Sequence, residues 1–193
     1  MMSRGKKEKY WSLKIPINLS KIDKEMNEYL LVCKEKLGMV PNILKTNTID
    51  KKKFKVFNLF YNRLMQDENF LTKCEKEMIA VVVSSINRCL YCCISHSYTL
   101  GKLLNDSAEA KNILINYKTA NLKIKHIKML DFVYKLTSSS HLINDTDRDN
   151  LRKAKFSENH ILEIIEVCSF FNMTNRIASG TNMRPNKEYY FSQ

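Results

Sequence analysis

Glycine and proline are scarce in this chain, with 4 Gly and 3 Pro among 193 residues. A loop-rich β-sandwich needs many of both at its turns, whereas long helices exclude them from their interiors. No segment alternates apolar and polar side chains with period two for long enough to form a convincing strand. These patterns predict an all-α fold, and the length suits one domain with a single core.

Amphipathic stripes locate the expected helices. After Asp50, for example, Phe57, Tyr61 and Leu64 recur at four- and three-residue spacings, the period of a helix with one apolar face. The same periodicity along the rest of the chain predicts a single-domain bundle of about seven to eight helices. Their approximate ranges are 21–36, 50–65, 72–86, 89–104, 107–117, 122–137, 146–155 and 157–178.

Short polar motifs predict where several helices begin. A capping residue followed three positions later by an acid occurs at Ser20–Asp23, Thr72–Glu75 and Thr146–Asp149, and Ser157 can cap the last helix. Gly38 and Pro41 are expected to end the first helix. We expect an N-terminal arm over residues 1–20, one all-α domain over 21–181 and a C-terminal tail over 182–193.

The charge of the chain raises the question of an acidic partner. The net charge is +12, which suits nucleic acid or an acidic membrane surface. The lysines are scattered, however, and the tight runs are confined to Lys6–Lys7 and Lys51–Lys53. A general bias toward Lys, Asn and Ile accounts for this pattern, so we expect neither a nucleic-acid nor a membrane partner.

No apolar stretch typical of a secretory signal follows the start of the sequence, and no run approaches the length of a membrane-spanning helix. The basic N-terminal stretch has no clear amphipathic pattern and gives only weak support to organellar targeting. We therefore expect a reducing, cytoplasmic setting. In such a setting a CxxC pair is more often catalytic or metal-binding than a structural disulfide.

One motif carries chemistry, and it runs from Cys89 through Cys92 to His96. On a helix these three residues fall within about 60° of one another and share a face. A thiol is a nucleophile only as the thiolate, and a neighbouring imidazole can accept its proton near neutral pH. A second thiol one turn away can then trap the oxidised partner as a disulfide. The pattern favours a redox function.

The surroundings of the motif strengthen this interpretation. Asn87 and Arg88 form a predicted break, so Cys89 and Cys92 are expected in the first turn of a helix. The free amides and the positive dipole end there should lower the pKa of a thiol below its usual value. Glu77 stands on the preceding predicted helix, and in an antiparallel hairpin its carboxylate can approach His96 and orient the ring. Alternatively, Glu77 is a solvated helix residue.

Other interpretations of the cysteines remain open. Helical geometry also permits Cys93 as a partner of Cys89 or His96, whereas free cysteines are often simply small buried side chains. A zinc knuckle needs four ligands, and the motif supplies three before His126. A thioredoxin-type domain would require a strand before the CxxC, which the pattern does not predict. We expect no metal and no cofactor.

Several segments together resemble a known family. They are Lys36–Asn42, Glu77–Ala80, Cys89–Cys92, His96–Ser97, Leu130–Asp131, Lys135–Thr137 and Phe170–Arg176. With these segments the chain resembles the alkylhydroperoxidase D-like branch of the carboxymuconolactone decarboxylase-like superfamily, in its peroxidase-related subgroup. The resemblance spans about Trp11 to Thr181. The most specific element is the combination of the Glu77 carboxylate, the CxxC pair and the histidine that follows it.

The resemblance implies an all-α fold in which the Glu77 helix and the cysteine helix pack around the site. It implies that Cys92 attacks the peroxide oxygen and becomes a sulfenic acid, that Cys89 resolves it as a disulfide, and that His96 and Glu77 relay the proton. It also implies a homo-oligomer. Tyr91 lies between the cysteines, where some members carry a second histidine, and this departure leaves the proton relay open.

The expected function is therefore that of a thiol-dependent peroxidase, which reduces alkyl hydroperoxides and is regenerated by an external thiol. One alternative is protein thiol–disulfide exchange. Another is a redox-responsive interaction module that uses its basic surface without significant peroxidase turnover. Lactone decarboxylation ranks last, because superfamily members with that activity generally lack the two cysteines.

Overall fold

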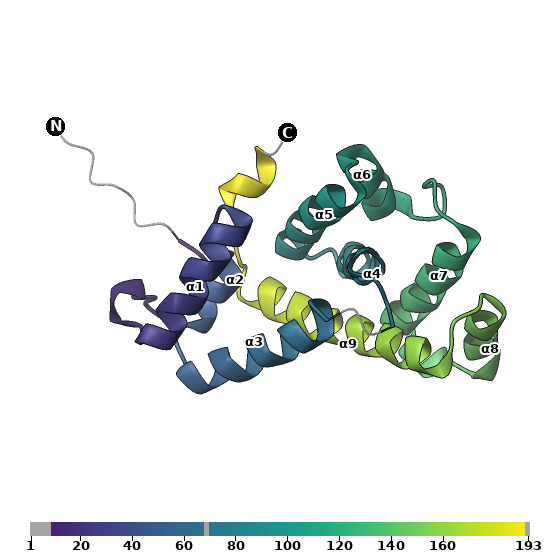
Figure 1. The fold of residues 1–193 in the computed structure, drawn as a ribbon, viewed down its shortest axis with the longest axis horizontal. Coiled ribbons are helices and arrows are strands. Elements are labelled where there is room, and N and C mark those ends of the chain that lie inside the picture. The colour runs from purple at the N-terminus through teal and green to yellow at the C-terminus, as the bar shows by residue number, and fades with distance from the viewer. Residues whose placement is uncertain (1–8, 68–69, 192–193) are drawn as a thin grey trace.

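The computed structural model describes residues 9–67 and 70–191 of the chain. These residues form nine α-helices and three short 3-10 helices and contain no strand, which confirms the all-α prediction (Figure 1). The α-helices are α1 (Lys24–Leu37), α2 (Asn42–Asn47), α3 (Lys51–Met65), α4 (Lys73–Ile86), α5 (Leu90–Leu104), α6 (Ser107–Asn116), α7 (Ile124–Ser138), α8 (Asp145–Lys153) and α9 (Glu158–Gly180). The 3-10 helices are η1 (Leu19–Lys21), η2 (Ser140–Leu142) and η3 (Lys187–Tyr190).

Eight of the α-helices correspond to the predicted ones, and α2 was missed. Its six residues are too few to show an amphipathic period, and it begins directly after Pro41, which the sequence suggested only as a helix stop. Gly38 adopts a left-handed conformation with φ 74° and ends α1, as predicted.

The predicted helix starts are partly correct. Thr72 and Glu75 form a reciprocal capping box on α4, and Ser157 caps α9. Ser20 was wrongly expected to cap the first helix. It lies in η1, and the Asp23 side chain caps α1 by accepting from the amide of Met26.

The start of α8 was also misplaced. Its capping box is formed by Asn144 and Asp147 rather than by Thr146 and Asp149. Two capping patterns overlap in this polar stretch, and the earlier one is used.

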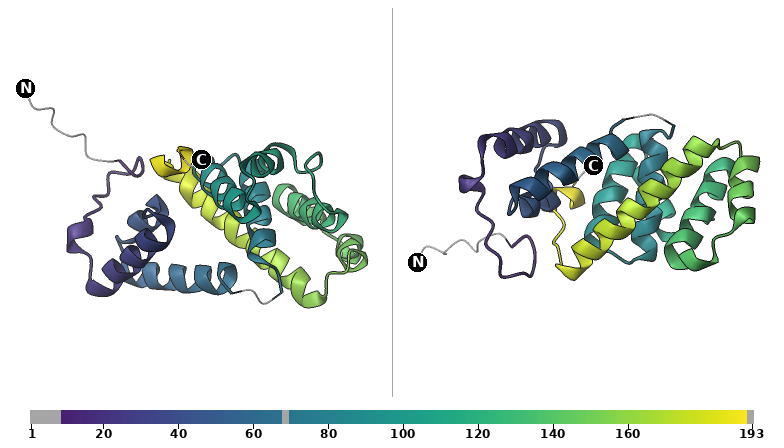
Figure 2. Two further views of the ribbon diagram at one scale, coloured as in Figure 1. Left: turned by 45° about the horizontal axis from the view of Figure 1, so that its top comes forward. Right: turned by 90° about the horizontal axis from the view of Figure 1, so that it is seen from below.

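Helix α4 is the centre of the bundle. It packs against α5, α6, α7 and α9, and Figure 1 shows it end-on between them. Its segment Ile79–Val83 is buried on every side, which is the pattern of a helix surrounded by other helices. Helix α9 runs diagonally across the molecule in Figure 2, from the region of α8 to the group formed by α1, α2 and α3. This arrangement brings α4 and α9 together at one end of α5.

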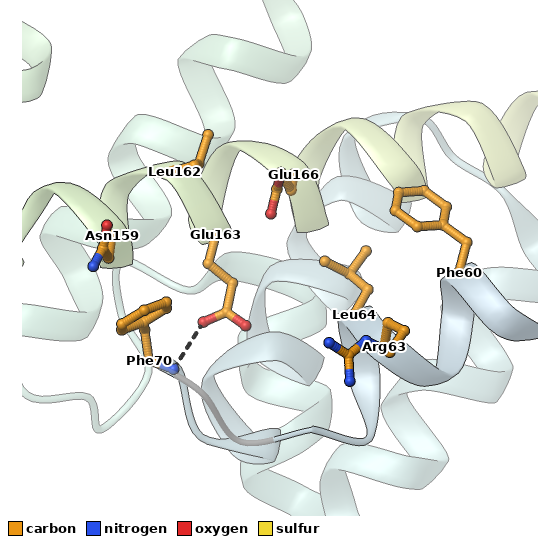
Figure 3. A pocket seen from close by; sticks show the side chains of 8 residues that line it. All are labelled: Phe60, Arg63, Leu64, Phe70, Asn159, Leu162, Glu163 and Glu166. Atoms are coloured by element: carbon orange, nitrogen blue, oxygen red, sulfur yellow. Dashed lines mark hydrogen bonds between the residues drawn. The ribbon is translucent and has the colours of Figure 1, made fainter.

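A buried ion pair ties α9 to the connection between α3 and α4. Lys76 is 0% exposed, and its Nζ lies 2.8 Å from a carboxylate oxygen of Glu163 on α9. The other oxygen of Glu163 accepts hydrogen bonds from the amides of Phe70, drawn in Figure 3, and Leu71. Lys76 also donates to the carbonyl oxygen of Asp67. The carboxylate thus satisfies two amides at the α4 end of the connection, and Lys76 links it to Asp67 at the α3 end.

Across the described part of the chain, no helix combines the length and the apolar character needed to span a membrane.

The ion pair generates a prediction about stability. Lys76→Met removes the cation and leaves the Glu163 carboxylate buried without its charged partner. We expect the free energy of unfolding to fall by about 3–5 kcal/mol. Denaturant unfolding measures this change. The matched control is Arg152→Gln, which breaks exposed ion pairs with Asp149 and Glu158 and should cost at most about 1 kcal/mol. Equal losses in the two variants would contradict a structural role for the buried pair.

Candidate active site

The turn between α4 and α5 places the cysteine motif. Asn87 ends α4, Arg88 takes a left-handed conformation with φ 51°, and Cys89 is the N-cap residue of α5. The Asn87 side chain donates to the side-chain oxygens of Asn172 and Asn175 on α9, which holds the turn against that helix. The break predicted at Asn87 and Arg88 is therefore present, with Cys89 at the cap and Cys92 within the first turn.

The two sulfurs lie together in the interior. Cys89 is 1% exposed and Cys92 is 3% exposed, and both are free thiols. A side-chain hydrogen bond joins them. The structure thus brings the predicted dithiol together and shields it from bulk solvent.

The hydrogen bond makes the two thiols unequal in acidity. The pKa of Cys89 is lowered to about 6, first by the hydrogen bond from the Cys92 thiol and then by the Cys92 amide and the Ser179 hydroxyl, against the effect of burial. The pKa of Cys92 is raised, by that same hydrogen bond to Cys89 and by burial. In the resting pair Cys89 therefore carries the charge and Cys92 carries the proton.

This asymmetry makes one sequence prediction more specific. The helix start was predicted to lower the pKa of a thiol without saying which one, and the structure assigns that effect to Cys89 and not to Cys92. The reason is that two adjacent buried sulfurs cannot both be ionised without strong repulsion. The sulfur at the helix N-cap carries the charge, and its neighbour stabilises that charge as a hydrogen-bond donor.

His96 and Glu77 form the second part of the site. His96 Nδ1 lies 2.8 Å from a carboxylate oxygen of Glu77, which is the contact predicted across the hairpin of α4 and α5. Both side chains are largely buried, and the imidazole also meets the edge of the Phe171 ring at 4.5 Å between centroids. An ionised carboxylate can only accept, so this bond assigns the proton to Nδ1 and leaves Nε2 as the basic nitrogen.

A cavity of about 540 Å³ reaches the site from outside. Cys92, His96 and Glu77 line it, whereas Cys89 does not. Most of its remaining wall is apolar and aromatic, and the residues involved include Leu44, Phe57, Met65, Leu103, Phe170 and Phe171. Of the two sulfurs, a ligand in the cavity meets that of Cys92.

Two residues on α9 touch the dithiol and were missed by the sequence analysis. The Ser179 hydroxyl hydrogen-bonds the Cys89 sulfur, and the Asn175 side chain hydrogen-bonds that of Cys92. Asn175 also donates to the Ser84 hydroxyl at 3.3 Å. Asn175 lies in the Phe170–Arg176 segment that carries the family resemblance, and Ser179 follows it by one helical turn, but neither residue was given a role at the site.

The Cys93 thiol is bound to the backbone of α4. It donates to the carbonyl oxygen of Ser84 at 3.2 Å, and Cys93 does not line the cavity. Burial raises its pKa to about 11, so it stays protonated at neutral pH. The alternative in which Cys93 pairs with His96 is therefore not supported by the geometry.

His126, considered as a fourth zinc ligand, instead lies 3.4 Å from a carboxylate oxygen of Glu75. Among the described residues, no group of three or more His, Cys, Asp or Glu side chains is arranged to hold a metal ion.

Known proteins share this architecture and part of this sequence. The carboxymuconolactone decarboxylase family matches residues 53–114, which include Glu77, both cysteines and His96. An uncharacterized peroxidase-related protein from Silicibacter sp. TM1040 is 42% identical with a TM-score of 0.92, covering 96% of each chain. The chain belongs to the alkylhydroperoxidase D-like and carboxymuconolactone decarboxylase-like superfamily.

A second relative of this superfamily, from Ralstonia eutropha JMP134, is described as an alkylhydroperoxidase AhpD core and an uncharacterized peroxidase-related protein. It is 32% identical with a TM-score of 0.87, over 91% of this chain and 93% of that one. The debrominase Bmp8 shares the fold, with a TM-score of 0.77 at 16% identity over 91% of this chain and 92% of its own. None of the curated proteins matches the chain.

The acidity of Cys89 generates a prediction about titration. As the pH falls through about 6, the dithiol should gain a proton and lose its thiolate absorbance in the ultraviolet. Cys92→Ala removes the donor that lowers the pKa of Cys89 most, so the midpoint should move up toward the ordinary thiol value. Cys93→Ser is the matched control and should leave it unchanged. A midpoint that stays near 6 in Cys92→Ala would contradict the assignment of the donor.

Proposed function

We propose that the protein is a thiol-dependent peroxidase that reduces organic hydroperoxides through a Cys89–Cys92 dithiol and disulfide cycle. The observation that carries the proposal is the hydrogen-bonded pair of buried thiols, one of them acidic, with the other at the base of an apolar cavity. The Glu77–His96 pair lines the same cavity and supplies a base beside the reacting sulfur.

In the first step of the proposed reaction, the Cys92 sulfur attacks the terminal oxygen of the hydroperoxide. A sulfur–oxygen bond forms, the oxygen–oxygen bond breaks, and the alcohol oxygen leaves with the bonding electrons. His96 Nε2 takes the thiol proton of Cys92 and returns it to the leaving oxygen, which gives an alcohol and a Cys92 sulfenic acid. Glu77 holds the ring in the required orientation and stabilises the transient imidazolium.

In the second step, Cys89 resolves the sulfenic acid. It is already a thiolate at neutral pH, so it attacks the Cys92 sulfur without first losing a proton. The disulfide forms, and hydroxide leaves and takes up a proton to give water. An external thiol then acts as the second substrate, reduces the disulfide and restores the dithiol. Because the pKa of Cys92 is raised, its thiol is not ionised beforehand, and the proposed attack requires His96 to take the proton while the sulfur–oxygen bond forms.

Protein thiol–disulfide exchange is the alternative. It requires a partner protein to bring a disulfide in line with the attacking sulfur. Cys89 and Cys92 are no more than 3% exposed, which hinders the approach of a partner protein's disulfide. A small hydroperoxide, in contrast, can enter through the cavity. The burial of the two sulfurs also disfavours a redox-responsive module whose cysteines react directly with other proteins.

We further propose that the protein works in a reducing, cytoplasmic setting, that it binds neither membranes nor nucleic acid, and that it self-associates. Val56 and Leu59 on α3 are strongly exposed and offer apolar surface for contact with a second copy.

A peroxide pulse tests the proposed function. One equivalent of cumene hydroperoxide should convert the reduced protein to a single Cys89–Cys92 disulfide, identified by peptide mapping. Cys92→Ser should abolish the reaction because it removes the attacking sulfur. Cys93→Ser is the matched control and should form the disulfide at the wild-type rate.

Steady turnover of cumene hydroperoxide with dithiothreitol separates a peroxidase from the alternatives. Reduction of insulin disulfides at a comparable rate, without peroxide turnover, would support thiol–disulfide exchange instead. A Cys89–Cys93 bridge after the pulse, or no disulfide at all, would overturn the proposed function.

A further inference from the structure

The C-terminal segment of the described chain is anchored beside the site by two asparagines. The Asn186 side chain accepts from the amide of Asn42 at 2.7 Å and donates to the carbonyl oxygen of Val40 at 2.9 Å. The Asn42 side chain in turn donates to the carbonyl oxygen of Arg184 at 2.8 Å. Asn42 and Asn186 are both buried. These contacts hold η3 against the start of α2.

This anchoring places Tyr189 in the wall of the cavity, together with Cys92, His96 and Glu77. Its ring meets that of Tyr98 on α5 in an edge contact, with 5.2 Å between centroids. Burial, and to a smaller extent the negative charge of Glu77, raise the pKa of its phenol, so the hydroxyl keeps its proton. Tyr189 therefore presents a protonated hydroxyl in the wall of the cavity that Cys92 also lines.

The Tyr189 hydroxyl is the last in a chain of hydrogen bonds that starts at the backbone. The amide of Ile43 donates to the Tyr91 hydroxyl at 3.2 Å, and a further side-chain hydrogen bond joins Tyr91 to Tyr189. Tyr91 accepts from Ile43 and so uses its own proton toward Tyr189. Tyr189 then has its proton left for a ligand, and each bond in such a chain polarises the next.

We infer that Tyr189 is a hydrogen-bond donor to the hydroperoxide bound above Cys92, and that Tyr91, in the position between the cysteines, serves to orient it. This inference rests on the proposed function. The alcohol oxygen gains negative charge as the oxygen–oxygen bond breaks, and a phenol held in a largely apolar cavity stabilises that charge. His96 still supplies the proton, so Tyr189 changes the rate without changing the stoichiometry.

The test compares two reactions of the same reduced protein. Stopped-flow measurement follows disulfide formation after one equivalent of cumene hydroperoxide, and a parallel measurement follows alkylation of the dithiol by iodoacetamide. Tyr189→Phe should slow disulfide formation by about 10- to 100-fold, because one donor to the leaving oxygen is lost. Alkylation has no leaving oxygen and should keep its wild-type rate.

Tyr190→Phe is the matched control, because Tyr190 is the next residue of η3 and is exposed. It should leave both rates unchanged. Equal disulfide formation in Tyr189→Phe and wild type would overturn the inference while leaving the proposed function in place. Equal slowing of both reactions, or the same loss in Tyr190→Phe, would also overturn it, because either result indicates altered packing. A wild-type protein that does not react with hydroperoxide would overturn both the proposed function and this inference.

Discussion

The hydrogen bond between the Cys89 and Cys92 thiols is the interaction on which the rest of the site depends. Two thiols buried separately would both become weaker acids, because burial disfavours the thiolate. Joined at the start of α5, they instead share one proton, and the charge rests on the sulfur that also receives the Ser179 hydrogen bond. The pair therefore contains one thiolate and one thiol that are already in contact.

The surrounding helices determine which sulfur is buried inside the protein and which one lines the cavity. Cys89, as the N-cap residue, is directed into the protein, whereas Cys92 lies within the first turn and lines the cavity. Helix α4 supplies Glu77 to orient the imidazole of His96, and α9 supplies the polar side chains that contact the sulfurs. The central burial of α4 and the ion pair of Lys76 with Glu163 keep these helices in register. Stability and site geometry thus depend on the same contacts.

Local patterns predicted most of the fold. Capping residues and amphipathic stripes act within a few residues, so the helix over 73–86 with its Thr72–Glu75 box could be predicted from its own segment. Helix α2 could not, since six residues do not define a period. The contact of Glu77 with His96 was predictable because a tight turn after α4 leaves an antiparallel hairpin as the simplest arrangement.

The remaining features of the site depend on contacts between distant parts of the chain. Ser179 and Tyr189 reach the site from segments about a hundred residues beyond the cysteines, and no local pattern marks them. The division of charge between the two cysteines follows from which sulfur donates to the other. Helical spacing places both on one face but does not determine the donor, and for this reason the sequence could not assign the lowered pKa to one of the two cysteines.

The division of roles between the two sulfurs is tested most directly by trapping the first oxidised species. In Cys89→Ser the resolving sulfur is absent, so a sulfenic acid formed by cumene hydroperoxide should persist and react with dimedone. Mass spectrometry of the peptides then identifies the labelled cysteine. The account predicts one dimedone adduct, on Cys92. An adduct on Cys93, or labelling of Cys89 in the reciprocal Cys92→Ser variant at a comparable rate, would contradict it.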